Sequence, residues 1–362
     1  MKYSLLFSLL LVAISASAKK NDSLDIKIGQ MIMMGINERI SLPATDPLIQ
    51  DLKAGKLGGV VIFEKNLAKS HTRDSLILLV QNLQQSSLVP LFVSIDEEGG
   101  KVHRLKEKYG FFSTPSAAYL GEVNKFDSTR YHSRRIAALL RELGINFNYA
   151  PALDMAVNPE NTVIVKNGRS FGADPFLVAT HAQVVINAHH EYGVKTILKH
   201  FPGHGSSAGD SHLGVVHVSG TWQLNELTPY DELIRHGSID AIMTAHIINK
   251  RWDPDLLPAT LSAKTVNGLL RGLLGYKGVV FSDDMQMDAI SDNYGLEKAI
   301  VLAVNAGVDV LMFANTAPKK EKLVTATQVH DIIKKLVRKK KISRERINEA
   351  YERIMALKNK QF

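Results

Sequence analysis

The 362-residue sequence has no cysteine and only two tryptophans. The absence of cysteine excludes disulfide bonds, thiol catalysis, thiolate metal sites and a lipidated cysteine at the start of a mature chain. Beyond the N-terminus, the sequence also lacks any apolar run of the roughly 20 residues that a membrane-spanning helix needs. We therefore expect no stable membrane insertion.

The first 18 residues differ from the rest of the chain. Lys2 supplies a positive start, an apolar run extends from Leu5 to Ile14, and Ala16-Ser17-Ala18 provides the small residues of a cleavage site. This pattern is typical of a secretory signal peptide, and the run is too short for the alternative, a membrane anchor. We expect residues 1–18 to be removed and residues 19–362 to form an exported, soluble protein, which is periplasmic if the source has two membranes.

The composition is that of a globular protein, with 45% hydrophobic and 22% charged residues. Much of the excess positive charge, formally +8, lies late in the chain, in Lys334-Lys335 and from Arg338 to Lys341. Cations at the end of a helix interact favourably with the negative pole of its dipole, so we interpret this cluster as a solvated helix end. No aromatic platform or reading motif accompanies it, and we expect no nucleic-acid partner.

Eight short apolar runs recur along the chain, and amphipathic segments separate most of them. The predicted strands are Gln30–Gly35, Gly58–Phe63, Pro90–Asp96, Asn146–Pro151, Val194–His200, Ala241–His246, Gly278–Asp283 and Val308–Phe313. The predicted helices are Asp46–Lys56, Ser70–Gln85, Phe126–Leu143, Pro175–Tyr192, Leu224–His236, Ala263–Leu274 and Glu297–Ala306. Strand–helix alternation implies parallel pairing, and eight units in about 300 residues predict a closed (β/α)8 barrel of the TIM type.

An open doubly wound sheet is the alternative α/β architecture. No Gly-rich dinucleotide fingerprint follows the first strand, which disfavours it. The last segment, Ser343 to Lys358, starts with a capping serine and has apolar residues at helical spacing. It predicts a C-terminal helix packed on the outside of the barrel. One barrel uses almost the whole mature chain, so we expect a single catalytic domain, 19–362, acting as a monomer.

Charged and imidazole side chains follow the predicted strands three to seven. They are Asp96, Arg104, Arg169, Lys199, His200, His246 and Asp283. In (β/α)8 barrels the active site lies at the carboxyl ends of the strands, so these groups are expected at one rim. Taken singly, Asp96 and Asp283 also suit helix caps, His246 a structural histidine, and Arg169 a loop-fixing salt bridge. Their convergence favours a catalytic site.

Two chemistries fit the loop after the fifth strand. Metal-assisted hydrolysis would use His200, His204, Asp210 and His212, but their spacing matches no standard zinc signature, so we expect no metal. A carbohydrate-processing site instead needs a carboxylate nucleophile and a separate proton donor. Asp283 would supply the nucleophile. Asp210 and His212 would form a carboxylate–imidazole pair in which the anion favours the protonated ring.

Five motifs carry a resemblance to a known family. They are Asp96-x-Glu98-Gly99-Gly100-x3-Arg104-Leu105, Gly168-Arg169-Ser170-Phe171-Gly172, Lys199-His200-Phe201-Pro202-Gly203-His204-Gly205, Asp210-Ser211-His212 and Phe281-Ser282-Asp283-Asp284-Met285. In this order, over nearly the whole mature chain, they resemble family 3 glycoside hydrolases. The sequence is most similar to the single-domain β-N-acetylglucosaminidases, also called β-N-acetylhexosaminidases. Lys101 departs from the arginine that the resemblance leads us to expect.

The resemblance implies a retaining hydrolase without a cofactor. It would remove terminal non-reducing β-linked N-acetylglucosamine, or N-acetylhexosamine, from muropeptides or chitin-type oligosaccharides. Asp283 would attack the anomeric carbon and form a covalent glycosyl-enzyme, while His212, oriented by Asp210, would protonate the departing oxygen. The residues that would hold the terminal sugar are Asp96, Arg104, Arg169, Lys199 and His200.

Two other functions remain open. A histidine acid repels an incoming phosphate less than a carboxylate does, so the same site could support phosphorolysis. A non-catalytic sugar-binding paralogue is the second alternative, against which the presence of Asp283 and His212 argues. Gly205 and Gly209 further suggest that the loop carrying Asp210 moves over bound sugar.

Overall fold

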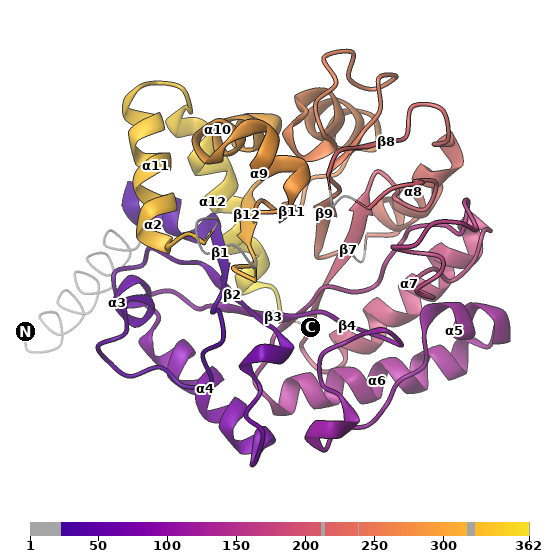
Figure 1. Cartoon of the computed structure of the whole chain (residues 1–362), viewed down its shortest axis with the longest axis horizontal. Helices are drawn as coiled ribbons and strands as arrows, with labels where there is room; N and C mark the ends of the chain where they lie inside the picture. Colours follow the sequence, from indigo (N-terminus) through magenta and orange to yellow (C-terminus); the bar gives the residue numbers. More distant parts are fainter. Residues whose placement is uncertain (1–22, 211–213, 238, 317–322, 362) are drawn as a thin grey trace, which may run out of the picture.

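The computed structural model describes residues 23–210, 214–237, 239–316 and 323–361. The predicted signal segment 1–18 and His212 lie outside the described residues. The barrel strands are β1 (Ile32–Gly35), β2 (Gly59–Ile62), β3 (Phe92–Ile95), β6 (Phe147–Asn148), β7 (Lys195–Phe201), β9 (Ala241–Thr244), β11 (Val279–Asp284) and β12 (Val310–Phe313). They pair in parallel and close in the order β1-β12-β11-β9-β7-β6-β3-β2 (Figure 1). The predicted (β/α)8 barrel is confirmed, and each predicted strand overlaps one of its strands.

The strands are apolar on both faces because helices cover the outside and side chains fill the inside. Every residue of β1, β2, β3 and β12 is buried. Inside the barrel, the ring of Phe147 lies 4.9 Å from that of Phe92 and 5.6 Å from that of Phe281, measured between centroids. Because β3 and β11 are not neighbours in the sheet, these three rings fill the interior and make it a packed core.

Helices surround the barrel (Figure 1). They are α2 (Leu24–Gln30), α3 (Pro47–Lys53), α4 (Thr72–Ser86), α5 (Ala117–Val123), α6 (Phe126–Glu142), α7 (Pro175–His190), α8 (Thr228–His236), α9 (Asp288–Tyr294), α10 (Leu296–Ala306), α11 (Ala326–Arg338) and α12 (Arg344–Asn359). A π-helix, Lys264–Leu273, joins β9 to β11. Each predicted helix overlaps one of these elements. None of the described helices combines the length and apolar character needed to cross a membrane.

The C-terminal helix α12, which the sequence predicted, packs against α2 and β11. Ile347 and Ile354 are fully buried. Near its end, Lys358 Nζ donates to Gln30 Oε1 at 2.6 Å and to the Gly58 carbonyl at 2.8 Å. Gly58 precedes β2, so α12 is tied to the amino ends of the strands and leaves their carboxyl ends open.

One assignment near the start of the chain differs from the sequence prediction. Gln30 was assigned to the first strand but ends α2, which begins after a cap in which Ser23 accepts from the Ile26 amide. The basic cluster does lie at a helix end, that of α11, as predicted. Two of its lysines also pair across elements: Lys334 Nζ lies 2.7 Å from Asp25, and Lys335 Nζ lies 2.7 Å from Glu297.

Candidate active site

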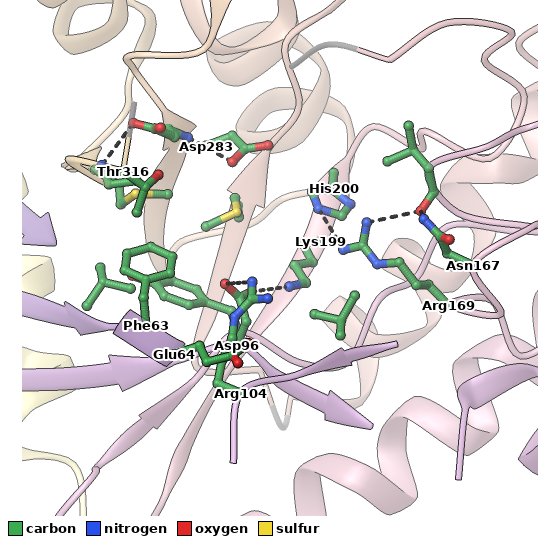
Figure 2. A pocket seen from close by; sticks show the side chains of 18 of the residues that line it. Phe63, Glu64, Asp96, Arg104, Asn167, Arg169, Lys199, His200, Asp283 and Thr316 are labelled. Carbon is green, nitrogen blue, oxygen red and sulfur yellow. Dashed lines mark hydrogen bonds and ion pairs between the residues drawn. The ribbon is translucent and has the colours of Figure 1, made fainter. Parts of the chain in front are cut away.

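A cavity of about 830 Å³ opens at the carboxyl ends of the strands. Seven of the eight predicted site residues line it: Asp96, Arg104, Arg169, Lys199, His200, Asp210 and Asp283. The eighth, His212, lies outside the described residues. In Figure 2, Asp283 lies on one side of the cavity, with Asp96 and Arg104 on the opposite side and Arg169 beside His200. The fold therefore brings the ends of β3, β7 and β11 to one cavity.

An ion-pair network forms one wall of this cavity. Lys199 Nζ, from β7, lies 2.8 Å from Asp96 Oδ1 and 2.5 Å from Glu98 Oε1. Arg169 grips Glu98 with two hydrogen bonds, from Nε at 2.9 Å and from Nη2 at 2.7 Å. Arg104 Nη2 donates to Asp96 Oδ2 at 3.1 Å. Three cations and two carboxylates are thus locked together, and fork-like pairing of this kind fixes orientation as well as charge.

The carboxylates of this network stay ionised although they are buried. Burial opposes the charged form of Asp96, but the charges of Lys199 and Arg104 outweigh it and hold the pKa of that carboxyl far below its usual range. In the same way, burial is outweighed by Arg169 and Lys199, which lower the pKa of Glu98 to about 2. The wall therefore presents fixed charges over the whole physiological pH range.

A second polar contact, with Asp154, supports His200. Asp154 is fully buried and accepts from His200 Nδ1 at 2.6 Å, from the His200 amide at 3.2 Å and from the His204 amide at 2.7 Å. The pKa of Asp154 falls well below its usual range because the histidines and these hydrogen bonds outweigh the cost of burial. Asp154 thereby fixes both the ring of His200 and the backbone after β7.

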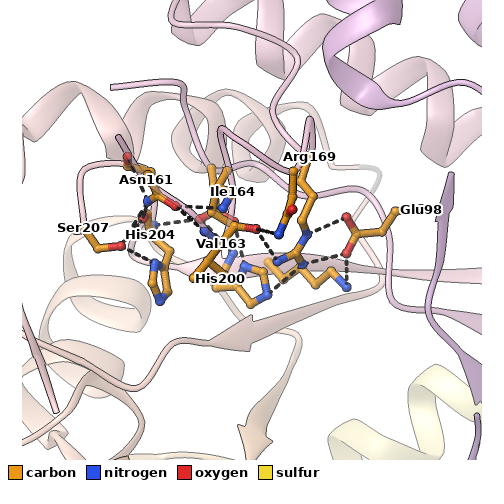
Figure 3. Close-up of polar contacts among 12 residues, drawn as sticks. Glu98, Asn161, Val163, Ile164, Arg169, His200, His204 and Ser207 are labelled. Atoms are coloured by element: carbon orange, nitrogen blue, oxygen red, sulfur yellow. Dashed lines mark hydrogen bonds and ion pairs between the residues drawn. The ribbon is translucent and has the colours of Figure 1, made fainter. Parts of the chain in front are cut away.

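The loop after β7 is held closely as far as Ser207. Asn161 donates to the His204 carbonyl at 2.8 Å and to Ser207 Oγ at 3.0 Å (Figure 3). A Cβ on Gly205 would lie only 1.7 Å from the Met155 carbonyl oxygen. The glycine is therefore required for close approach of two backbones, which accounts for its presence without loop flexibility.

Asp283 is the penultimate residue of β11 and faces the cavity (Figure 2). Its Oδ1 accepts from the Asp284 amide at 2.7 Å. The interpretation of Asp283 as a helix cap is wrong, since Met287 precedes α9 and contributes no side-chain cap. Asp96 likewise pairs with Lys199 and Arg104 and caps no helix. Asp210 lines the same cavity as Asp283, which is the arrangement that a shared reaction centre requires.

His246 is a structural histidine, as its isolated position suggested. It is fully buried, with Nδ1 2.9 Å from Thr260 Oγ1 and Nε2 2.9 Å from the Asp284 carbonyl oxygen. It steadies the backbone beside Asp283 without lining the cavity.

The metal interpretation gains no support from the described residues. The Nδ1 atoms of His200 and His204 are engaged by Asp154 and Ser207, at 2.6 and 2.7 Å. Burial lowers the pKa of His204 to about 4. In the part of the chain that the structure describes, no group of three or more His, Asp or Glu side chains has an arrangement suited to a metal ion.

Sequence reasoning did not assign Glu98 and Asp154 to the site. Three predicted cations, Lys199, Arg104 and Arg169, faced a single predicted carboxylate in the sugar-holding set, and this imbalance could have pointed to Glu98. Asp154 follows the fourth strand, but nothing in its spacing shows that it meets His200, which is 46 residues away in the sequence.

Comparison with known proteins was made against family models, curated proteins and solved structures. Residues 23–357 match the model described as "Glycosyl hydrolase family 3 N terminal domain". The chain is 35% identical to the beta-hexosaminidase of Tolumonas auensis over 269 residues, covering 73% of this chain and 77% of that protein. It is 32% identical to beta-hexosaminidase A of Pseudoalteromonas piscicida over 322 residues, covering 84% of this chain but only 53% of the relative.

Among solved structures, a glycoside hydrolase family 3 beta-N-acetylglucosaminidase from Paenibacillus superposes with a TM-score of 0.84 and 37% identity, covering 93% of this chain and 62% of that one. The chain thus spans about half to three quarters of the length of these relatives. The family match extends over nearly all of the described residues, from α2 to α12. The chain belongs to glycosyl hydrolase family 3.

Proposed function

We propose that this protein is a retaining β-N-acetylhexosaminidase that removes terminal non-reducing β-linked N-acetylglucosamine from muropeptides or chitin-type oligosaccharides. The observation that carries the proposal is the shared cavity, in which Asp283 faces the wall of Asp96, Arg104 and Lys199, with Asp210 also at its lining. The hexosaminidase names of the relatives support the same substrate class.

In the proposed reaction, the Asp283 carboxylate attacks the anomeric carbon and the bond to the leaving oxygen breaks. A proton passes from His212 to that oxygen, and the sugar remains as an ester of Asp283. Water then attacks the same carbon, His212 takes a proton from it, and the Asp283 carboxylate is released. Two displacements on one carbon retain the anomeric configuration.

His212 is assigned as acid and base from its position in the sequence, two residues after Asp210. Asp210 lines the cavity that Asp283 faces, so the adjoining segment starts beside the reaction centre. A carboxylate next to an imidazole stabilises the charged ring, which is the form that donates a proton. Positioned acid–base catalysis of this kind contributes roughly 10²–10⁴ in rate.

The ion-pair wall would bind the hydroxyl groups of the sugar. Its donors come from Arg104, Lys199, Arg169 and His200, which all line the cavity. Because their carboxylate partners remain ionised, these donors and acceptors keep fixed positions and require little reorganisation when sugar binds. The wall is therefore suited to orienting the sugar, and Asp283 to attacking its anomeric carbon.

Turnover of a chromogenic β-N-acetylglucosaminide tests the proposal. We expect Asp283→Ala to lower kcat by about 10⁴-fold or more while affinity for N-acetylglucosamine persists. A fluorinated N-acetylglucosaminide that slows the second step should leave the peptide containing Asp283 heavier by one sugar, as measured by mass spectrometry. Asp231→Ala, on the surface helix α8, is the matched control and should retain activity. Labelling of a different residue would contradict the assignment.

The acid is tested with substrates of graded leaving-group acidity. His212→Ala should lose little activity on acidic phenols and much more on poor leaving groups, because only the latter need protonation. His236→Ala, an exposed histidine of α8, is the control. Equal losses on good and poor leaving groups would show that His212 is not the acid.

The same assays separate the alternative functions. Product analysis with and without inorganic phosphate distinguishes hydrolysis, which yields free N-acetylglucosamine, from phosphorolysis, which yields the sugar 1-phosphate. A protein that binds sugar but converts no glycoside would be a non-catalytic paralogue. Identifying the products from a panel of muropeptides and chitobiose would show which natural glycan is cleaved.

We further propose that residues 1–18 direct export and that residues 19–362 act as a monomer in the periplasm or outside the cell. N-terminal sequencing of the mature protein should begin at Lys19 or close to it. Size-exclusion chromatography with light scattering should give the mass of one chain.

A further inference from the structure

Behind the ion-pair wall lies a buried pair that the proposed reaction does not use, Glu97 and His103. They face each other across a short antiparallel hairpin of β4 (Glu97–Gly99) and β5 (Val102–His103). The side chains are 2% and 7% exposed, and His103 Nδ1 contacts Glu97 Oε1. In the sequence, the hairpin lies directly between Asp96 and Arg104, which both line the cavity.

Glu97 holds the backbone on either side of the Arg104 side chain. Its Oε2 accepts from the Arg104 amide at 2.9 Å and from the Leu105 amide at 3.2 Å. The Glu97 amide in turn donates to Asn148 Oδ1 at 3.0 Å, and Asn148 Nδ2 donates to the Glu97 carbonyl at 3.0 Å. Arg104 is thus fixed at its main chain by Glu97 and at its guanidinium by Asp96.

We propose that Glu97 and His103 form a positioning pair that holds Arg104 against the sugar pocket, and that the proton on His103 sets how firmly it holds. The proposal rests on the proposed function only in taking N-acetylglucosamine as the ligand. Neither residue lines the cavity, so both act through Arg104.

The charge state of His103 follows from its surroundings. The charged groups around its ring are Glu97, Glu107 and Lys106, and its Nε2 lies 4.0 Å from Glu107 Oε2. Burial alone would lower the pKa of His103, but the hydrogen bond and charge of Glu97 outweigh it and raise that pKa. The charged contact is therefore complete below the usual titration range of histidine and is lost as the pH rises through the raised value.

Loss of the proton turns a charge-assisted hydrogen bond into an ordinary one. Such bonds are roughly twice as strong as neutral ones, so we expect the affinity for N-acetylglucosamine to fall about fivefold as the pH rises through the His103 pKa. The measurement is the Ki of N-acetylglucosamine, a neutral ligand, from about pH 5.5 to about pH 8.5, the range in which histidine titrates.

Three variants give the proposal a distinctive test. In Glu97→Gln, the carboxylate that raises the pKa of His103 is absent and burial favours the neutral ring, whose Nδ1 can accept from the amide NH₂, so the affinity should lack the wild-type fall with pH. His103→Gln keeps a donor for Glu97 without a charge, and its Ki should lack this pH dependence. The double variant Glu97→Gln/His103→Gln restores a donor–acceptor pair and should recover affinity within about twofold, independent of pH.

The control is His190→Gln, which removes another buried histidine–carboxylate contact, 2.6 Å from Asp240 Oδ2, at the amino end of β9. It should keep the wild-type pH dependence. The His200–Asp154 contact is present in every protein of the series, so its contribution cancels in the comparison. An affinity that falls with pH in Glu97→Gln as in wild type would overturn the proposal.

Hydrogen exchange at the Arg104 and Leu105 amides supplies a readout that needs neither turnover nor sugar. After correction for intrinsic rates, protection of these amides should fall about fivefold with pH in wild type but not in Glu97→Gln. If no protein of the series binds N-acetylglucosamine, the proposed ligand is wrong, and amide exchange alone decides on the positioning pair. Unchanged protection in all variants would refute it.

Discussion

Replacing Glu98 by glutamine tests whether the charges in the ion-pair wall are coupled as strongly as their geometry indicates. The carboxylate is 7% exposed and receives three charged contacts, two from Arg169 and one from Lys199. Glu98→Gln keeps the size and one acceptor oxygen but removes the charge. Lys199 retains Asp96 at 2.8 Å, whereas Arg169, only 10% exposed, loses its bidentate partner.

The magnitude follows from the pKa of Glu98, which moves from its usual 4.5 to about 2. At 1.36 kcal/mol per unit, that shift corresponds to about 3 kcal/mol of folding free energy at neutral pH. An independent estimate agrees, because removing one partner of a buried ion pair typically costs about 3–5 kcal/mol. We therefore expect Glu98→Gln to destabilise the protein by about 3 kcal/mol at pH 7.

Urea unfolding followed by the fluorescence of Trp222 and Trp252 measures this difference. Because the folded-state pKa of Glu98 is lowered, its contribution is present above about pH 4.5 and disappears as the pH falls through about 2. The deficit of Glu98→Gln should therefore shrink on acidification. Glu160→Gln, which loses a surface contact with Lys166, is the matched control and should change little. A variant as stable as wild type at pH 7, or a deficit independent of pH, would refute the reasoning.

Three further predictions concern the supports of the site. Gly205→Ala should lower the melting temperature by several degrees, because its Cβ would lie 1.7 Å from the Met155 carbonyl oxygen, whereas Gly220→Ala, which has nothing within 4 Å, should not. Asp154→Asn should weaken the binding of N-acetylglucosamine about tenfold in calorimetry. Both oxygens of Asp154 accept from His200 or His204, and the NH₂ group of asparagine would place a donor against one of these donors. Burial raises the pKa of Glu226 to about 7, so wild-type stability should fall from about pH 4.5 to about pH 7; Glu226→Gln should lack this fall and exceed wild type at pH 8 in urea unfolding.

The barrel could be predicted from sequence because each strand is buried on both faces and is therefore continuously apolar. The runs around Val60 and Leu311 show this clearly, and each lies within a predicted strand. The short helix α2 could not be predicted in the same way. Its seven residues carry too little periodicity, and the helix is held by Ser23 at its start and by packing against α12.

The sequence predicted most of the residues that line the cavity, but not which of these side chains form ion pairs with each other. Strand ends located Asp96, Lys199 and Asp283, because parallel strands deliver their carboxyl ends to one rim. The sequence does not show that Arg169 grips Glu98, since that contact spans 71 residues and depends on how the loop after β6 folds back. Pairings of this kind are set by tertiary packing and leave no local pattern.

The two ends of the barrel show why buried charge alone does not identify a binding site. At the amino end, Asp309 is fully buried between Arg271 at 2.7 Å and Arg353 at 3.1 Å, an ion cluster much like that of Asp96. Arg271 also donates from Nη1 to the carbonyl oxygen of Gly278 and from Nη2 to that of Gly307, both at 3.1 Å.

These main-chain hydrogen bonds and the ion pairs with Asp309 join the π-helix and α12 to the strands. At the carboxyl end, Arg104 and Lys199 are held by carboxylates in the same manner, yet they line a cavity of about 830 Å³. Burying ion pairs gives little net stability compared with apolar packing, so an ion cluster that leaves donors facing an open cavity needs a reason other than folding. Recognition of a hydroxyl-rich ligand, as proposed for the ion-pair wall, would supply that reason.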